Sequence, residues 1–231
     1  MTQCDGYISS GSLEKDLLSV ATQKEKLKWM KLTGEMLDVD YTVLFPKPLS
    51  ETLMDRLEQI VEYYTGDLTK VKVFGKWHQI PRQQVAYGDT GLKYTFSGTT
   101  IPAKPWFPLL ELVKNVVEEI SRCQFNFVLI NKYRNGCDNI GPHRDDEKEI
   151  DKNTPIASLS LGQQRTFVFT HRDARLKGKL KRSIAPVKIE LEPGSLLLMN
   201  SPTNEVWYHS LPPRKSLHSP RINLTFRKIN S

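Results

Sequence analysis

The sequence predicts a mainly β fold with flanking helices, in which the strands form a sandwich or a barrel. Two segments in the first half of the chain carry apolar residues at helical spacing. From Val39 onward, nearly all other segments are short, strand-like and separated by Gly, Pro, Asn or Asp. Because the helices come early and the strands late, we expect the helices to pack on the outside of the strands.

Residues 1–38 differ from the sequence that follows them. A loose helical stripe runs through this region among Lys and Glu, and its members are Leu13, Leu17, Val20 and Leu27. No turn residues enclose the stripe, so we expect residues 1–38 to form a mobile N-terminal extension with some helical tendency. Residues 39–231 then form the folded domain.

Two helices and ten strands are expected inside the domain. The first helix begins near Pro48 and Ser50, and its apolar residues are Leu49, Leu53, Leu57, Ile60 and Tyr64. The second helix follows Pro105, and its apolar stripe consists of Leu109, Val113, Val116 or Val117, and Ile120. The strand-like segments are 40–45, 70–74, 83–87, 125–133, 156–161, 166–170, 184–190, 195–200, 206–210 and 221–229.

Composition excludes several classes of protein. A chain of 231 residues with 39% hydrophobic and 26% charged residues can fold around a core of its own. No apolar run approaches the roughly 18 residues of a membrane helix, so we expect no membrane partner. The first 20 residues lack a basic start followed by an apolar core, so we expect no secretory signal, and three scattered cysteines indicate a reducing compartment.

Positive charge is concentrated in two segments of the second half. The net charge of the chain is +7. Residues 165–188 contain eight Lys or Arg and one acid, and residues 214–231 contain five Lys or Arg and no acid. Such segments are typical of a surface that binds a polyanion. A solvated loop and tail, or a nuclear import signal at 177–182, would have the same composition.

Three side chains can form a metal site. His143 and Asp145 are two residues apart, so they share a face of an extended segment. His209, at the end of a predicted strand, can supply a third ligand. Two His and one carboxylate form the facial triad of non-haem iron(II) oxygenases. The motif is short, and a surface His beside a local acid is the simpler interpretation of this spacing alone.

Residues 221–227 alternate strictly between polar and apolar side chains. The polar face consists of Arg221, Asn223, Thr225 and Arg227. Two arginines on an interior face would be costly without an anion beside them, and a dicarboxylate such as 2-oxoglutarate would supply one. A solvent-facing edge strand is the alternative. Asn131 and Tyr133 share a face at the end of another strand and can bond to the same acid.

Together these residues resemble the AlkB family of iron(II)- and 2-oxoglutarate-dependent dioxygenases, and within it the homologue 2 type, a nuclear DNA dealkylase of vertebrates. The resemblance covers residues 39–229, and its stretches are 73–78 (VFGKWH), 94–98 (YTFSG), 125–133, 140–147 and 220–229. Their combination is specific, whereas no single stretch is. The resemblance implies a double-stranded β-helix (jelly-roll) core, an Fe(II) cofactor, 2-oxoglutarate and O2 as co-substrates, and a nuclear location.

The resemblance also implies roles for individual residues. The iron ligands would be His143, Asp145 and His209. The residues that hold 2-oxoglutarate would be Asn131, Tyr133, Arg221, Thr225 and Arg227. The residues that contact the damaged DNA would be Phe74, Gly75, Lys76, Tyr94, Thr95, Phe96, Asp146 and Glu147. Among these, Phe74 would fill the gap left by a flipped base. From the sequence alone, Phe74 could instead be a core residue, Tyr94 and Phe96 an aromatic pair, and Asp146 and Glu147 part of a polar turn.

The implied activity is repair of double-stranded DNA by oxidative dealkylation of N1-alkyladenine and N3-alkylcytosine, extending to etheno adducts, with base flipping and release of an aldehyde. The same chemistry on single-stranded DNA or RNA is one alternative, and a non-catalytic nucleic-acid-binding jelly roll is another. We expect a monomer. Members of this type can carry a basic-aromatic motif for the replication sliding clamp, and residues 1–10 (MTQCDGYISS) lack it, which argues against clamp binding.

Overall fold

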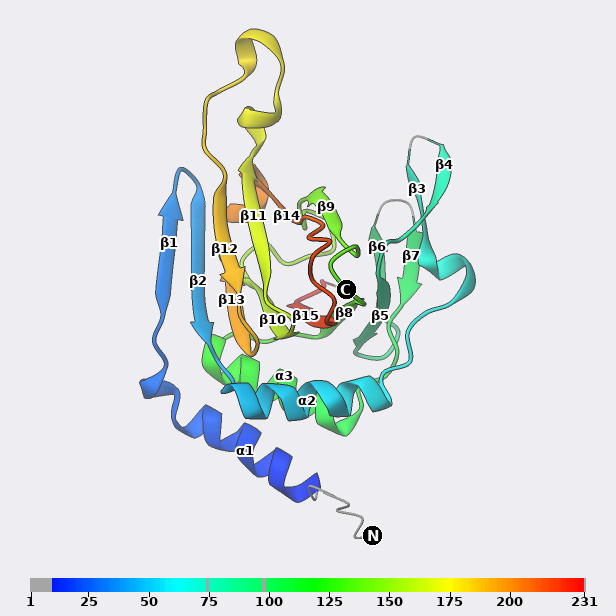
Figure 1. Cartoon of the computed structure of the whole chain (residues 1–231), viewed down its shortest axis with the longest axis vertical. Helices are drawn as coiled ribbons and strands as arrows, with labels where there is room; N and C mark the ends of the chain where they lie inside the picture. The colour runs from blue at the N-terminus through cyan, green and yellow to red at the C-terminus, as the bar shows by residue number, and fades with distance from the viewer. Residues whose placement is uncertain (1–9, 74, 97–98, 231) are drawn as a thin grey trace.

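Two antiparallel sheets form the centre of the protein (Figure 1). The computed structural model describes residues 10–73, 75–96 and 99–230. The larger sheet contains, in spatial order, β1 (Met30–Gly34), β2 (Leu37–Val43), β13 (Ser195–Met199), β10 (Ile156–Gly162), β15 (Arg221–Arg227), β8 (Phe127–Tyr133) and β5 (Gln83–Gly88). The smaller sheet contains β12 (Val187–Leu191), β11 (Arg165–His171), β14 (Trp207–Leu211) and β9 (Ile140–His143). This architecture confirms the expected mainly β fold with a jelly-roll core.

Helices cover one side of the larger sheet, as expected (Figure 1). They are α1 (Ser10–Thr22), α2 (Lys47–Ile60) and α3 (Pro108–Ser121), with a short α4 (Thr203–Val206) before β14. In α3 the buried side chains are Leu110, Val113, Val116 and Val117. In α2 they are Ser50, Leu53, Met54 and Leu57, whereas Ile60 is 40% exposed because the buried face continues from Leu57 to Val61. Helix α2 packs on β10, and α1 contacts both α2 and α3.

Residues 10–38 are part of the fold, which corrects the expectation of a mobile extension for this part of residues 1–38. Leu13 and Leu17 of α1 are buried in the main core. Strand β1 pairs with β2 along its whole length, so the larger sheet begins nine residues before the expected boundary at Val39. Sequence patterning missed this because the apolar residues of α1 face other helices, and because β1 is an exposed edge strand. Residues 1–9, which include most of the segment considered for clamp binding, lie outside the described residues.

Two ribbons contain three strands that were not expected. One ribbon is β3 (Lys70–Val73) with β4 (Lys76–Gln79), and the other is β6 (Lys93–Phe96) with β7 (Thr99–Pro102). The unexpected strands are β4, β6 and β7, whereas β3 matches the expected strand 70–74. The β3–β4 ribbon and the loop between β11 and β12 project from the end of the molecule opposite the helices (Figure 1). Within the described residues, no helix combines the length and the apolar character needed to cross a membrane.

The middle strands of the larger sheet are buried on both faces. Every residue of β15 is buried, because one face of the strand meets the apolar core and the other faces the smaller sheet. Register then decides what lies together on the inner face. Arg221 is directly opposite Tyr133, and Asn223 is opposite Asn131. Four polar side chains from β15 and β8 therefore gather between the two sheets.

Candidate metal and co-substrate site

A cavity of about 780 Å³ lies between the two sheets. From the larger sheet it is lined by Asn131, Tyr133, Ser158, Arg221, Asn223, Thr225 and Arg227. From the smaller sheet and its flanks it is lined by His143, Arg144, Asp145, Asp146, Glu147, Phe167, Tyr208 and His209. Strict alternation along β15 produces half of this arrangement, because every second residue points into the cavity.

Three potential metal ligands meet at the smaller sheet. His143 ends β9 and is paired in register with His209 of β14. Asp145 follows two residues after β9. One ligand atom from each of the three residues lies within 4.8 Å of the others. Asp145 Oδ1 is 3.6 Å from His143 Nε2 and 3.9 Å from His209 Nε2, which is a spacing that a small cation can bridge.

Hydrogen bonds and burial prepare these groups for a cation. His143 Nδ1 lies 2.9 Å from the carbonyl oxygen of Gly141, so the neutral ring donates there and leaves a lone pair on Nε2. Burial lowers the pKa of His143, and burial together with His143 lowers the pKa of His209 to about 3. Burial alone would raise the pKa of Asp145, but Arg227 and the two imidazoles lower it well below its ordinary value. Two neutral imidazoles and one carboxylate fit Fe(II).

At the other end of the cavity, Arg221 is a buried cation without an anion. Its Nη2 donates to Ser160 Oγ at 2.9 Å, and its guanidinium lies 5.2 Å from the centre of the Tyr133 ring. Its Nε is buried and has no hydrogen-bond partner, and no carboxylate in the described part of the chain pairs with it. Burial lowers the pKa of Arg221 to about 10. A carboxylate of a bound acid would satisfy both the charge and the free N–H group.

The second arginine of β15 has a different partner. Arg227 Nη2 donates to Asp145 Oδ2 at 2.6 Å, and both side chains are buried. Burial opposes the charge of Arg227, but Asp145 outweighs it and raises the pKa of Arg227. The guanidinium also lies 5.2 Å from the ring centre of Tyr94. Arg227 therefore orients a potential metal ligand, whereas Arg221 is free to bind an acid.

The remaining residues predicted for 2-oxoglutarate also line the cavity. Asn131 Oδ1 accepts from Arg82 Nε at 2.7 Å, and Thr225 Oγ1 donates to Asn223 Oδ1 at 3.0 Å. Tyr133, the last residue of β8, is buried, and its ring faces the guanidinium of Arg221. These contacts fix the wall around the unpaired cation. Arg82 was not predicted from the sequence, because it lies in a turn before β5.

The residues predicted to contact a lesion are divided between the cavity wall and the β3–β4 ribbon. Tyr94 is buried in the wall, with its ring 5.2 Å from that of Phe127, and Thr95 lies beside it. Phe96 is described only as the last residue of β6, and Phe74 lies outside the described residues. Gly75 has φ +78°, which glycine adopts at low cost in the turn of the ribbon, and Lys76 is exposed at the start of β4.

The two acids after Asp145 also face the cavity. Asp146 is exposed and forms an ion pair with Arg144. Glu147 Oε2 is buried without a hydrogen-bond partner, and burial together with Asp145 raises the pKa of Glu147. Glu147 therefore offers an unsatisfied acceptor close to the candidate metal ligands.

One predicted phosphate contact is corrected by the structure. Arg165 was expected to belong to a basic surface segment, but it is 1% exposed. Its guanidinium donates to the carbonyl oxygens of Asn135 (3.3 Å), Asp138 (3.0 Å) and Pro212 (2.8 Å). Alternate residues of β11 point inward, and Arg165 occupies an inward position. The alternation of residues along β11 indicates that Arg165 is buried. The count of charged residues in the segment does not distinguish buried from exposed arginines.

The sequence also gave no indication of a role for Tyr208, which lines the cavity next to His209. Its ring centre is 5.1 Å from the guanidinium of Arg144 and 4.6 Å from that of Arg175. Arg175 belongs to the loop 172–186, which joins β11 to β12 and contains most of the first basic segment. The stack therefore connects that loop with the mouth of the cavity.

Comparison with known proteins agrees with this geometry. A sequence profile of the 2OG-Fe(II) oxygenase superfamily matches residues 41–227. A mouse (Mus musculus) protein named DNA oxidative demethylase ALKBH2 is 55% identical over 201 residues, which cover 87% of this chain and 84% of that protein. The human (Homo sapiens) protein of the same name is 54% identical over 201 residues, covering 87% and 77%. A solved structure described as "The structure of OsALKBH1" matches 86% of this chain and all (100%) of that chain, with a TM-score of 0.56 at 16% identity, which supports the fold alone.

Proposed function

Because this chain belongs to the 2OG-Fe(II) oxygenase superfamily, we propose that it repairs double-stranded DNA by oxidative dealkylation of N1-alkyladenine and N3-alkylcytosine. The observation that carries this proposal is the content of one cavity. Three metal-ligand side chains, an arginine without an anion and two further acids all line it. The DNA substrate is supported by the relatives named DNA oxidative demethylase, which are 54–55% identical over most of the chain.

We assign the iron to His143, Asp145 and His209, and the far carboxylate of 2-oxoglutarate to Arg221. When bound, iron(II) with 2-oxoglutarate and O2 supplies the oxidising power that hydroxylates a C–H bond. Arg227 holds Asp145 ionised and in place. The Gly141 carbonyl oxygen fixes the ring of His143 so that its Nε2 faces the same point as Asp145 Oδ1. A hydroxylated N-alkyl carbon is then lost from the base as an aldehyde.

The acids at the cavity suit a cationic base. Alkylation at N1 of adenine or N3 of cytosine adds a positive charge and blocks the pairing edge, which lowers the cost of flipping the base. Asp146 and Glu147 would face such a base, and the free Glu147 oxygen can accept from its exocyclic amine. Tyr94, whose side chain interacts with that of Glu147, offers an aromatic surface in the same part of the cavity. Etheno adducts of the same bases belong to the proposed substrates.

Some of the phosphate contacts would come from elements at one end of the molecule. The loop 172–186 and the β3–β4 ribbon project there, and a duplex laid across that end would meet both (Figure 1). Lys177, Lys179 and Lys181 form no ion pair among the described residues, so their charge is available to a polyanion. Arg214 and Lys215, the other phosphate contacts that we propose, lie in the loop that follows β14, where Arg214 Nη1 is 4.0 Å from Glu190 Oε2 near the opposite end of β11. These contacts position a duplex without reading its sequence.

A product assay tests the proposal. Duplex and single-stranded oligonucleotides carrying 1-methyladenine or 3-methylcytosine are incubated with the protein, iron(II), ascorbate and 2-oxoglutarate, and the strand is weighed by mass spectrometry. We expect loss of the methyl group from the duplex, and no change with His209→Ala. Turnover of the single strand alone would support the alternative substrate, and absence of turnover on every substrate would support a binding function without catalysis.

Two further expectations follow from a role in DNA repair. We propose a nuclear location, which a fluorescent fusion would report. We also propose that the protein acts as a monomer, which light scattering of the protein with and without duplex DNA would test.

A further inference from the structure

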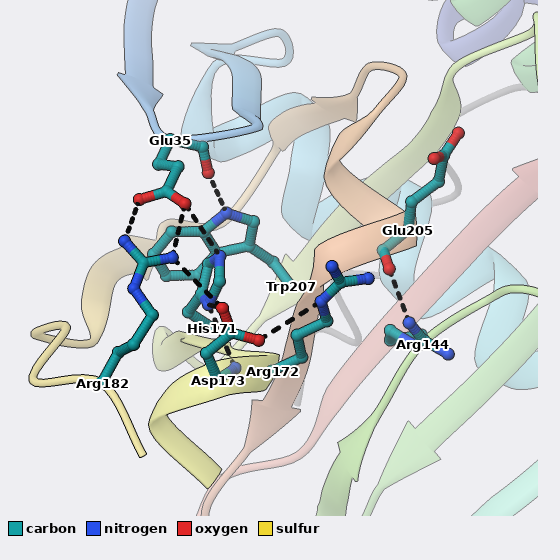
Figure 2. A network of polar contacts seen from close by, with 8 residues as sticks. All are labelled: Glu35, Arg144, His171, Arg172, Asp173, Arg182, Glu205 and Trp207. Carbon is teal, nitrogen blue, oxygen red and sulfur yellow. Dashed lines mark hydrogen bonds and ion pairs between the residues drawn. The ribbon is translucent and has the colours of Figure 1, made fainter. Parts of the chain in front are cut away.

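A network of charged side chains joins the loop 172–186 to the turn between β1 and β2 (Figure 2). Glu35 lies in that turn, and its two carboxylate oxygens accept from Arg182 Nη1 and Nη2, both at 2.6 Å. Arg182 Nη1 also donates to Asp173 Oδ2 at 3.1 Å. These hydrogen bonds hold the pKa of Glu35 below its ordinary value. A bidentate pair of this kind fixes orientation as well as distance.

The same turn is tied to the strand that carries His209. The backbone carbonyl oxygen of Glu35 accepts from the indole N–H of Trp207 at 2.8 Å, and Trp207 is buried at the start of β14. His171 Nδ1 accepts from the backbone N–H of Asp173, so its neutral ring carries the proton on Nε2. That nitrogen lies 3.9 Å from Glu35 Oε1. Glu35 is therefore held by β14 through its backbone and holds the loop through its side chain.

The loop itself is closed by its own contacts. The backbone N–H groups of Leu176 and Arg182 both donate to the carbonyl oxygen of Asp173, at 3.4 and 3.1 Å. This closure leaves Leu180 73% exposed and leaves three lysines without ion pairs among the described residues: Lys177, Lys179 and Lys181. The bond from Arg182 to Glu35 connects the closed loop to the β1–β2 turn, in addition to the stack of Arg175 on Tyr208 of β14.

We propose that Glu35 is a positioning residue for duplex DNA, which holds the loop 172–186 so that its free lysines meet the phosphate backbone. This inference rests on the proposed function. An acid beside a polyanion site repels the ligand, so Glu35 works against binding unless it contributes through position. A loop that is already ordered loses less conformational entropy on binding, and this favours the clamped arrangement.

Glu35→Gln tests the inference, because it removes the charge while keeping the backbone carbonyl that binds Trp207. Glu25→Gln is the matched control, since Glu25 is exposed, forms no ion pair among the described residues and gives the same net charge. We expect Glu35→Gln to raise KM for duplex substrate about two- to fivefold, the range that a surface ion pair supports. The salt dependence of duplex binding should become shallower, because fewer lysines reach phosphate. The kcat at saturating duplex and the KM for 2-oxoglutarate should be unchanged.

Three results would overturn the inference. One is duplex binding by Glu35→Gln that is as tight as in Glu25→Gln, or tighter, because then the acid only repels DNA. The second is failure of the charge-reversed pair Glu35→Arg with Arg182→Glu to recover affinity relative to each single variant. The third is an unchanged rate of tryptic cleavage within 172–186 in Glu35→Gln. If the wild-type protein neither bound nor processed duplex DNA, the proposed function would fail instead, whereas faster cleavage would still identify the clamp.

Discussion

Arg221→Met should change co-substrate binding and protein stability in opposite directions. Burial lowers the pKa of Arg221 to about 10, which places the cost of keeping it charged on the order of a few kcal/mol. Its side-chain hydrogen bond to Ser160 offsets about 1 kcal/mol of that cost. Replacing the cation with an apolar side chain of similar length should therefore stabilise the protein in the absence of 2-oxoglutarate. Replacement of buried charged groups by apolar side chains of similar volume is often stabilising in other proteins.

The effect on the co-substrate should be large. A hydrogen bond to a charged group contributes about 1.5–3 kcal/mol, so loss of a bidentate grip corresponds to about 3–6 kcal/mol. The affinity for 2-oxoglutarate should fall by roughly two to four orders of magnitude. Arg221→Lys keeps the charge but not the fork, and should lie between the two proteins. Calorimetric titration with iron(II) in the absence of O2 measures the affinity, and a thermal melt without co-substrate measures the stability.

Arg165→Met is the matched control for this pair of measurements. Arg165 is equally buried, but it satisfies three backbone carbonyl oxygens, and its loss leaves them without a donor. We expect Arg165→Met to lower Tm, whereas Arg221→Met raises it by roughly 2–4 °C for each kcal/mol gained. If Arg221→Met lowered Tm and left the affinity for 2-oxoglutarate unchanged, Arg221 would be a structural residue and the assignment of the anion site would be wrong.

Three other predictions can be checked with the same assays. Alanine at His143, Asp145 or His209 should abolish turnover, and it should abolish iron binding as measured by metal analysis. Activity near that of wild type in any of these variants would contradict the metal site. Phe74→Ala should reduce activity on duplex by roughly five- to hundredfold and barely affect single strands, because base stacking contributes about 1–3 kcal/mol; equal losses with a lowered Tm would indicate a core residue. Gly136→Ala would place a Cβ 1.8 Å from the carbonyl oxygen of Arg214, so we expect a loss of about 1–3 kcal/mol of stability and weaker duplex binding, and an unchanged melt would show that the loop can shift.

The fold could be predicted from the sequence where a segment has a regular pattern and is buried. The strand 221–227 and the helix after Pro105 are examples, because alternation and helical spacing follow directly from burial of one face. Strand β9 could not be predicted in this way. It contains Gly141 and Pro142, which rarely occur inside strands, and it pairs at the edge of the smaller sheet. Strand β4 is exposed along its whole length, so it has no apolar alternation to detect.

The residues of the candidate site could be predicted from the sequence, but the contacts between their side chains could not. Alternation placed Arg221 and Arg227 on one face, and the structure places both on the cavity wall. Their different partners depend on tertiary contacts, since Asp145 is 82 residues from Arg227 in the sequence. The bond between Glu35 and Arg182 joins positions 147 residues apart. No local sequence pattern indicates either pair, because each of the four side chains, taken by itself, has the character of an ordinary surface charge.

The position of β15 has a consequence for how the chain is made. This strand lies between β10 and β8 in the larger sheet, although it follows every other described strand along the chain. During synthesis, β8 and β10 therefore leave the ribosome long before their shared neighbour and present unpaired edges in the meantime. Pairing over such a separation is slow. The same strand brings Arg221 and Arg227, so a nascent chain halted before residue 221 has a gap in its main sheet and lacks both arginines of the cavity wall.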